Sequence, residues 1–461
     1  MIIGVIPRFY HLGYENVWID ECFSLKEAER LSFWDALISI KEENTNPPFS
    51  FLFIRYWIMI FGDSDFRIRF PFALMGTISI IVIYFVGKEL FNSKVGLVSS
   101  IIMSLSMVHV LYSQEARPYA IFTLTTLLSL LYYIRIMKYG KFREYTYYII
   151  PTIIFLYTHY FSIFTLFMQN IVFFLYYKRF KVSIRNWFCM QSIIAFSCIP
   201  ILWFLKKQFN TTQIAIFGQF TSKYGFMSVF SEMGVLLVIL PVLIILFSVA
   251  IIKITKFDIL HFFRKIGFNR NIFLVFAGIL LLLSALVLSR VTSSIFIFRY
   301  SHFIYPIFYI LFAKGFIMLK KQQKTILTIS FILVSSFLLF NYHFDVPRKA
   351  EWKNVATLIE SDYKEGELII MLNKITSVCL NHYYSGNNLD VVSLQAYSND
   401  IKNQEELSRL IANNDLENRK GVWLILSHAH NTRGFYRKYL NNSRNHDFKK
   451  VYKSIDVYHF S

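Results

Sequence analysis

The sequence has few cysteines, and their spacing argues against the usual cysteine-based sites. The four are Cys22, Cys189, Cys198 and Cys379, with no CxxC pair and no Cys/His ligand spacing. Neither a zinc site nor a disulfide framework is therefore predicted. Cys22 and Cys379 could pair only if both faced the outer side of a membrane, and we expect them to be unpaired.

Charged residues are also scarce. They make up 17% of the chain, against 55% hydrophobic residues and a mean hydropathy of +0.45, whereas a soluble domain of this size would be far less apolar. This composition predicts a membrane protein. The net charge of +19 comes from Lys and Arg between hydrophobic segments, which is typical of cytoplasmic loops and argues against nucleic-acid binding.

Apolar runs predict an α-helical polytopic protein with about eleven spans. Eight runs have near-spanning length: 68–86, 95–111, 119–137, 187–205, 226–252, 272–289, 303–319 and 325–340. The run 147–177 is interrupted by Thr158-His159-Tyr160, so it predicts two short spans that meet at a turn. Residues 1–13 resemble the second half of a further span and are too short for a signal peptide, so we expect the native start to lie upstream of Met1.

Whether the run 49–61 crosses the membrane decides on which side the later loops lie. Arg55 lies at the centre of this run. A charge at mid-bilayer costs about 2.5–3.5 kcal/mol on insertion scales, so we expect this run to dip or lie at the interface. Five loops on one side then hold seventeen Lys and Arg, namely 88–94, 138–144, 178–185, 253–270 and 320–324. The opposite short loops hold six, so the positive-inside rule makes the first set cytoplasmic.

The last quarter of the sequence changes character. Residues 1–341 form the predicted transmembrane domain, with 14–67 as its first outer loop, and 342–461 predict a small extracytoplasmic α/β domain. We expect its strands at 367–371, 391–394, 422–426 and 451–458, and its helices at 349–363 and 403–413. In the first outer loop, Ser24-x-x-Glu27 and Ser32-x-x-Asp35 predict the starts of two short interfacial helices.

Three groups of charged residues lie at predicted outer boundaries. Trp18-Ile19-Asp20-Glu21 offers adjacent carboxylates that could act as a general base or bind a metal, but taken alone the pair is better explained as solvated loop charges near a helix start. Glu115 and Arg117 follow a strongly apolar helix, where a local ion pair that anchors the helix end is the alternative. Arg299-Tyr300 could bind phosphate, and a snorkelling arginine is the alternative.

Taken in order, these motifs resemble the GT-C superfamily, specifically the polyprenyl-phosphate-sugar transferases related to protein O-mannosyltransferases and the lipid A aminoarabinose transferase (glycosyltransferase family 39-like). The resemblance is specific over about residues 8–180, and the tail from Glu351-Trp352-Lys353 is similar to the outer domain of many members. The segments that carry it are 8–13, 18–21, 46–49, 66–71, 112–119, 158–160 and Arg299-Tyr300. Asn46 stands where relatives often carry His or Lys, which puts a phosphate or metal contact there in doubt.

The resemblance implies inverting transfer of a monosaccharide from a polyprenyl-phosphate donor to a lipid, glycan or protein acceptor on the outer face of the plasma (inner) membrane. Asp20 matches the family's catalytic aspartate and would take the acceptor's proton, with Glu21 and Glu115 as further catalytic candidates. The candidates for binding the donor phosphate are Arg117, Arg299, Tyr300, His159 and Arg69. No cofactor follows from the residues, and a divalent metal at the carboxylates stays open.

Two other functions share these features. A GT-C enzyme that transfers a lipid-linked oligosaccharide, or ligates polysaccharide, would use Asp20 and Glu115 similarly, but the small outer loops favour a monosaccharide donor. A membrane transporter would place ionisable residues near the bilayer centre and often shows repeats, and neither is apparent in the sequence. The sugar, the acceptor and the polyprenol type cannot be read from the sequence.

Overall fold

The chain divides into two compact units. The computed structural model describes residues 2–28, 32–43, 46–206, 304–372, 375–386, 388–394, 416, 419–427 and 433–461. The first unit comprises Met1–Tyr10, Arg30–Ile60 and Ile68–His343, and the second comprises His11–Glu29, Phe61–Arg67 and Phe344–Ser461. Two segments of the predicted first outer loop therefore fold with the C-terminal region.

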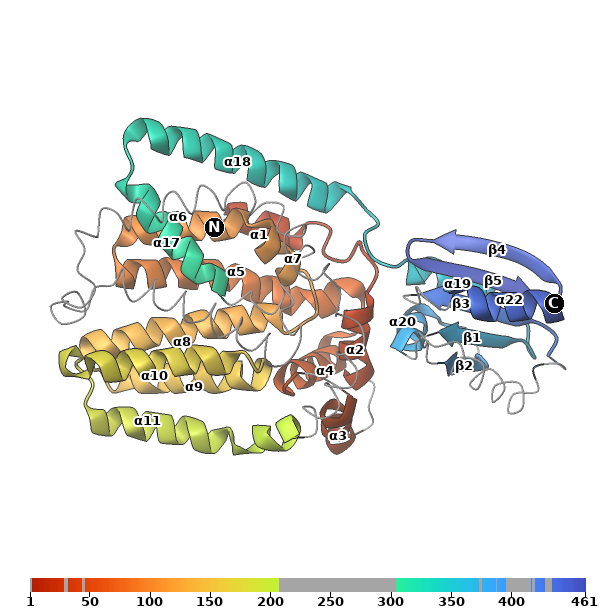
Figure 1. The fold of residues 1–461 in the computed structure, drawn as a ribbon, viewed down its shortest axis with the longest axis horizontal. Helices are drawn as coiled ribbons and strands as arrows, with labels where there is room; N and C mark the ends of the chain where they lie inside the picture. Colours follow the sequence, from red (N-terminus) through yellow and green to blue (C-terminus); the bar gives the residue numbers. More distant parts are fainter. Residues whose placement is uncertain are drawn as a thin grey trace. The chain divides into compact units, whose positions relative to one another are not determined.

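The first unit is helical (Figure 1). Its helices are α1 (Ile2–Phe9), α3 (Phe33–Glu43), α4 (Phe49–Phe61), α5 (Asp65–Leu90), α6 (Ser93–Leu105), α7 (Met107–Ser113), α8 (Tyr119–Tyr139), α9 (Arg143–Thr158), α10 (Ser162–Tyr176), α11 (Ile184–Ser197), α17 (Tyr305–Met318) and α18 (Lys321–Phe344). Among the described residues, α5, α8 and α18 are each long and apolar enough to cross a membrane, and two bent helix pairs raise the number to five. The predicted spans 226–252 and 272–289 lie outside the described residues.

The apolar runs 147–177 and 95–111 are both broken in the structure, but the sequence predicts only the first of these breaks. The turn at His159 is confirmed, because α9 ends at Thr158 and α10 begins at Ser162. The run 95–111, predicted as one span, is bent by 65° where α6 meets α7, and the pair is either one broken span or a re-entrant loop. Ser106 caps α7 by accepting the His109 N–H at 3.3 Å, which gives the chain a helix start inside an apolar run.

Small and polar residues join the helices of the first unit. A Cβ atom on Gly87 of α5 would lie 2.8 Å from the Cα atom of Gly96 of α6, so glycine is needed at this crossing. Gln169 of α10 accepts from the Tyr148 hydroxyl at 2.9 Å and donates to Ser129 at 3.1 Å, which links α8, α9 and α10. Such contacts are the usual means by which helices associate in a bilayer.

Three of the basic loops lie together at one end of the first unit. Glu89, at the end of α5, forms ion pairs with Arg135 (3.3 Å) and Lys138 (3.2 Å) of α8. The backbone N–H of Lys181 donates to the Met137 carbonyl at 3.0 Å. Loops 88–94, 138–144 and 178–185 thus share one end of the helices, which can be followed in Figure 1 at the α8–α9 and α10–α11 turns.

The second unit contains a mixed sheet in the order β2-β1-β3-β5-β4. Strand β1 (Leu368–Leu372) runs parallel to β2 (Val391–Leu394) and β3 (Val422–Ser427), whereas β5 (Ile455–Phe460) runs antiparallel to β3 and to β4 (His446–Tyr452). Strands β1 and β3 are buried along their whole length, as their unbroken apolar runs predict. The accompanying helices are α19 (Trp352–Asp362), α20 (Ile375–Tyr383) and α22 (Arg433–Ser443).

Two local predictions are wrong, and a third lies outside the described residues. The strand predicted at 451–458 is a hairpin of β4 and β5, with Ser454 in the left-handed region (φ 61°) at the turn. The helix predicted at 403–413 lies outside the described residues. Ser24 does not start a helix, because it lies inside α2 (Ile19–Ala28), whereas Ser32 does cap α3, accepting the Asp35 N–H at 3.1 Å.

Candidate functional site

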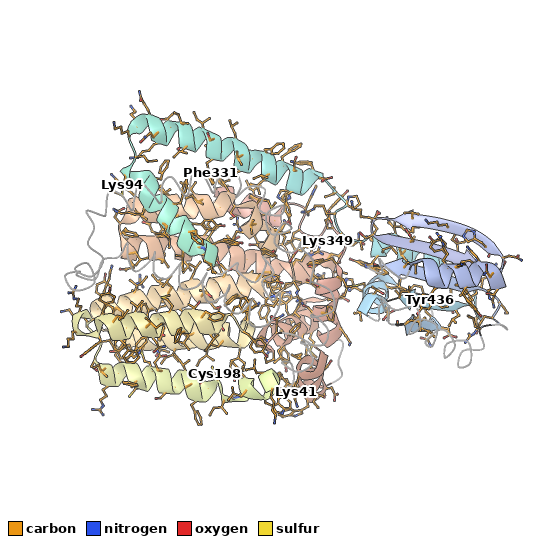
Figure 2. All side chains as sticks on the ribbon, viewed as in Figure 1. Lys41, Lys94, Cys198, Phe331, Lys349 and Tyr436 are labelled. Atoms are coloured by element: carbon orange, nitrogen blue, oxygen red, sulfur yellow. A yellow bond between two sulfur atoms is a disulfide. The ribbon has the colours of Figure 1, made fainter. Side chains whose placement is uncertain are left out.

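The adjacent acids Asp20 and Glu21 occupy different environments in the second unit. Both lie in the first turn of α2, where carboxylates are favoured by the helix dipole. Glu21 is fully buried and accepts from the Trp18 N–H at 3.2 Å and from Lys349 Nζ at 3.0 Å (Figure 2 labels Lys349). Asp20 is partly exposed. Glu21 is therefore held in a structural ion pair, and Asp20 is the better placed of the two to meet a substrate.

The backbone before Asp20 is held by the segment that follows α18. The Glu15 carboxylate accepts from the backbone N–H groups of Arg348 (3.0 Å) and Lys349 (2.9 Å). The Asn16 side-chain oxygen accepts from the Lys353 N–H at 2.8 Å. Glu15 is buried, so these contacts fix the course of the chain toward α2.

Cys22 and Cys379 form a disulfide, with an S–S distance of 2.08 Å and a Cα–Cα distance of 5.4 Å. The expectation that they are unpaired is therefore wrong. The bond joins α2 to α20 across 357 residues of sequence. A local spacing pattern cannot predict a pair of cysteines that far apart. The remaining cysteines, Cys189 and Cys198, are free.

Two motif residues of the first unit have structural roles. Arg8 is fully buried and donates to the carbonyl groups of Met103 (2.9 Å) and Ser104 (3.1 Å), which end α6 at its bend. Gln114 donates from Nε2 to the Tyr10 carbonyl at 2.8 Å and accepts from the Tyr342 hydroxyl at 2.8 Å. Both side chains satisfy helix-end groups that a buried helix terminus would otherwise leave unpaired.

Arg117 and His159 lie in the first unit, and the charge of Arg117 acts on the His159 imidazole. Both are buried, and the Arg117 guanidinium carbon lies 6.0 Å from the centre of the Phe51 ring. His159 stacks on Phe122 with ring centres 5.0 Å apart. Burial, and then the charge of Arg117, lower the pKa of His159 to about 3, so its imidazole is neutral near pH 7.

The tautomer of His159 follows from its backbone contact. Nδ1 faces the Phe161 N–H at 3.2 Å and must accept from it. The proton of the neutral ring therefore lies on Nε2, which makes this nitrogen a hydrogen-bond donor. Arg117 and His159 together can offer one charged and one neutral donor to an anion.

The other sequence candidates are distributed as follows. Glu115 and Arg69 are buried in the first unit, on the α7–α8 loop and on α5 respectively. Arg299 and Tyr300 lie beyond the part of the chain that the structure describes. Within the described ranges, no group of three or more His, Cys, Asp or Glu side chains has metal-binding geometry.

Comparison with known proteins gives one family match and one relative. Residues 45–204 match the family model described as dolichyl-phosphate-mannose-protein mannosyltransferase. An uncharacterized protein of Aquifex aeolicus (strain VF5) is 29% identical over 136 residues, or 28% of this chain. The match spans only 27% of that relative's length.

Two solved structures are similar over nearly the whole chain. ArnT from Cupriavidus metallidurans, bound to undecaprenyl phosphate, has a TM-score of 0.62 at 10% identity, with 99% of this chain and 96% of that chain covered. The archaeal oligosaccharyltransferase AglB from Archaeoglobus fulgidus, in complex with an inhibitory peptide and a dolichol-phosphate, has a TM-score of 0.53 at 10% identity, with 99% and 73% covered. At these identities the likeness establishes the fold.

Proposed function

We propose that the chain is a GT-C polyprenyl-phosphate glycosyltransferase that transfers a monosaccharide from a polyprenyl-phosphate donor to an acceptor on the outer face of the plasma membrane, as the family-model match over residues 45–204 supports. The observation that carries the proposal is the difference in burial between the two acids at the start of α2. Glu21 is buried against Lys349, whereas its neighbour Asp20 stays partly exposed. This is the arrangement expected of one structural and one reactive carboxylate.

In the proposed reaction Asp20 acts as a general base. It takes a proton from the acceptor nucleophile, which attacks the anomeric carbon from the face opposite the phosphate. The bond between that carbon and the phosphate oxygen breaks, and polyprenyl phosphate leaves with the bonding electrons. The configuration at the anomeric carbon is inverted in this single displacement, and no covalent enzyme intermediate forms.

The negative charge that develops on the leaving phosphate needs donors that are already in place. We assign this role to Arg117, by charge, and to the Nε2–H group of neutral His159. Arg69, Arg299 and Tyr300 remain candidates for further phosphate contacts, and Glu115 for a second acidic group of the site. Arginine suits this task because its planar fork donates paired hydrogen bonds to phosphate.

An outer location of Asp20 is supported by two independent features. Cys22, two residues after Asp20, forms a disulfide, and disulfides persist in oxidising compartments outside the cytoplasm. The three basic loops that gather at one end of the first unit match the cytoplasmic set that the positive-inside rule assigns. Both features agree with a C-terminal region on the outer side.

The experiment uses the purified protein in lipid nanodiscs with a panel of labelled polyprenyl-phosphate monosaccharides and one lipid-linked oligosaccharide. We expect one monosaccharide donor to release polyprenyl phosphate in the presence of an acceptor extract, and Asp20→Asn to lower the rate of release about 10²–10⁴-fold. Asp63→Asn is the matched control, because Asp63 is an exposed acid of the second unit. Release from the oligosaccharide donor alone would replace the proposal by its oligosaccharide alternative.

A further inference from the structure

One face of α20 holds the loop that carries Asp20. Cys379, His382 and Tyr383 are spaced i, i+3 and i+4, so they project from the same side of the helix. Helix α2 packs against α20. All three side chains contact residues that are far away in sequence and lie close to Asp20 or to the start of α5.

Two contacts of this face bracket Asp20. The Cys379 disulfide joins Cys22, two residues after Asp20. The Tyr383 hydroxyl accepts from the Val17 N–H at 2.7 Å, three residues before Asp20. The segment from Val17 to Cys22 is therefore fixed at both ends by a single helix.

The third contact ties the same face to the start of α5. The Tyr383 hydroxyl donates to Asp65 Oδ1 at 2.8 Å, and His382 Nε2 lies 3.3 Å from the same oxygen. The hydroxyl thus accepts one hydrogen bond and donates another, which fixes its orientation. A chain of hydrogen bonds runs from Val17 through Tyr383 to Asp65.

The opposite side of the loop is held by the 348–353 segment. Glu15, Asn16 and Glu21 accept from Arg348, Lys349 and Lys353. With Val17 and Cys22 held by α20, five of the eight residues from Glu15 to Cys22 carry an anchor from the C-terminal region. A displacement of about 1 Å at a reacting group can cost on the order of 10²-fold in rate, so such anchoring matters for a general base.

We propose that the Cys379–Tyr383 face of α20 is a positioning element for Asp20, and that the C-terminal region is thereby part of the catalytic machinery. This inference rests on the proposed function. Tyr383 and the Cys22–Cys379 pair are positioning residues, because they act through Asp20. Their loss changes the rate of the chemical step and leaves the affinity for donor unchanged.

Tyr383→Phe removes the hydroxyl that contacts Val17 and Asp65 and keeps the ring. Tyr384→Phe makes the same change one residue further along the chain and serves as its control. We expect Tyr383→Phe to lower kcat about tenfold or more, with the donor Kd within twofold of wild type, and Tyr384→Phe to leave both unchanged. For the disulfide, Cys22→Ser with Cys379→Ser should lower kcat similarly, while Cys189→Ser does not.

A double-mutant cycle separates positioning from general stability. If Tyr383 acts through Asp20, Tyr383→Phe has little further effect on the residual rate of an Asp20→Asn protein, whereas a merely structural residue lowers the rate in both backgrounds. Dithiothreitol provides a second test on folded wild-type protein: it should lower kcat, and the double Cys→Ser variant should not respond.

The proposed function and the positioning role of α20 can be overturned separately. An Asp20→Asn protein with wild-type turnover overturns the proposed function itself. An inactive Asp20→Asn protein beside fully active Tyr383→Phe and double Cys→Ser variants leaves the proposed function standing and overturns the positioning role of α20. Additive losses in the cycle overturn it as well.

Discussion

Lys349 Nζ donates to Glu21 Oε2 at 3.0 Å, and the two residues are 328 positions apart in the sequence. Glu21 is fully buried and the Lys349 side chain is 13% exposed. We expect Glu21→Gln to lower the free energy of unfolding by about 3 kcal/mol, the low end for breaking a buried ion pair, because Lys349 keeps some contact with water. Chemical denaturation of the purified protein measures this.

Asp20→Asn should show the opposite pattern to Glu21→Gln. The change keeps size and most hydrogen bonding but removes the basic lone pair, so turnover should fall about 10²–10⁴-fold while stability and donor affinity stay near wild type. Steady-state kinetics and a donor-binding assay test the pair of variants together. A Glu21→Gln protein that is stable but inactive would exchange the roles of the two acids.

Arg117→Ala should weaken binding of the polyprenyl-phosphate donor. A charge-assisted hydrogen bond to phosphate is worth about 1.5–3 kcal/mol, which corresponds to roughly 10- to 150-fold in Kd. Arg143→Ala is the control, because it removes an exposed arginine from the basic end of the first unit. Equal donor affinity in both variants would move the phosphate site away from Arg117.

Arg8→Met should destabilise the bend between α6 and α7. The substitution removes the donors to the Met103 and Ser104 carbonyls, and each buried acceptor left without a partner costs about 1–3 kcal/mol. Lys94→Met, at an exposed position near the start of α6 (Figure 2), should leave the melting temperature within a degree or two. Thermal unfolding in detergent compares the two, and equal melting temperatures would contradict the capping role of Arg8.

His159 should make the stability depend on pH. Its pKa is lowered to about 3 in the folded protein, so between about pH 6.5 and 3 the unfolded imidazole binds a proton that the folded one does not. The contribution is present above pH 6.5 and is lost as the pH falls toward 3. Melting curves across this window should have a shallower pH dependence in His159→Gln than in wild type.

Cysteine labelling tests the membrane orientation. In a Cys189→Ser, Cys198→Ser background that keeps the disulfide, a membrane-impermeant thiol reagent should label Lys453→Cys from outside intact cells. It should not label Lys181→Cys, which lies in a basic loop. Both positions are exposed. Reversed labelling would overturn the outer location of Asp20.

The helices and the central strands could be predicted because their signals are local. Continuous apolar runs identify α5, α8, β1 and β3, and the polar interruption at His159 identifies the turn between α9 and α10. The bend at Ser106 could not be predicted in the same way, because the donor that satisfies the end of α6 is Arg8, 95 residues away from Met103. The short helix α20 was missed, although it carries the contacts that hold the Asp20 loop.

The candidate site could be predicted only in part, because its decisive contacts are also not local in the sequence. The motif predicts that one of two adjacent acids is important, but their burial depends on Lys349 and on the packing of α2 against α20. The Cys22–Cys379 pair depends on the same packing. Contacts between segments several hundred residues apart leave no periodicity in the sequence, so only the fold reveals them.

The disulfide also has a consequence for biosynthesis. Cys22 is translated early, but its partner follows 357 residues later, which at about 5–20 residues per second corresponds to roughly 20–70 s of synthesis. Until Cys379 is synthesised, the Asp20 loop has no α20 to hold Val17 and Cys22. If the proposed function holds, a chain that stops before Cys379 lacks both the disulfide and the Tyr383 contact that hold the Asp20 loop, and it should be inactive.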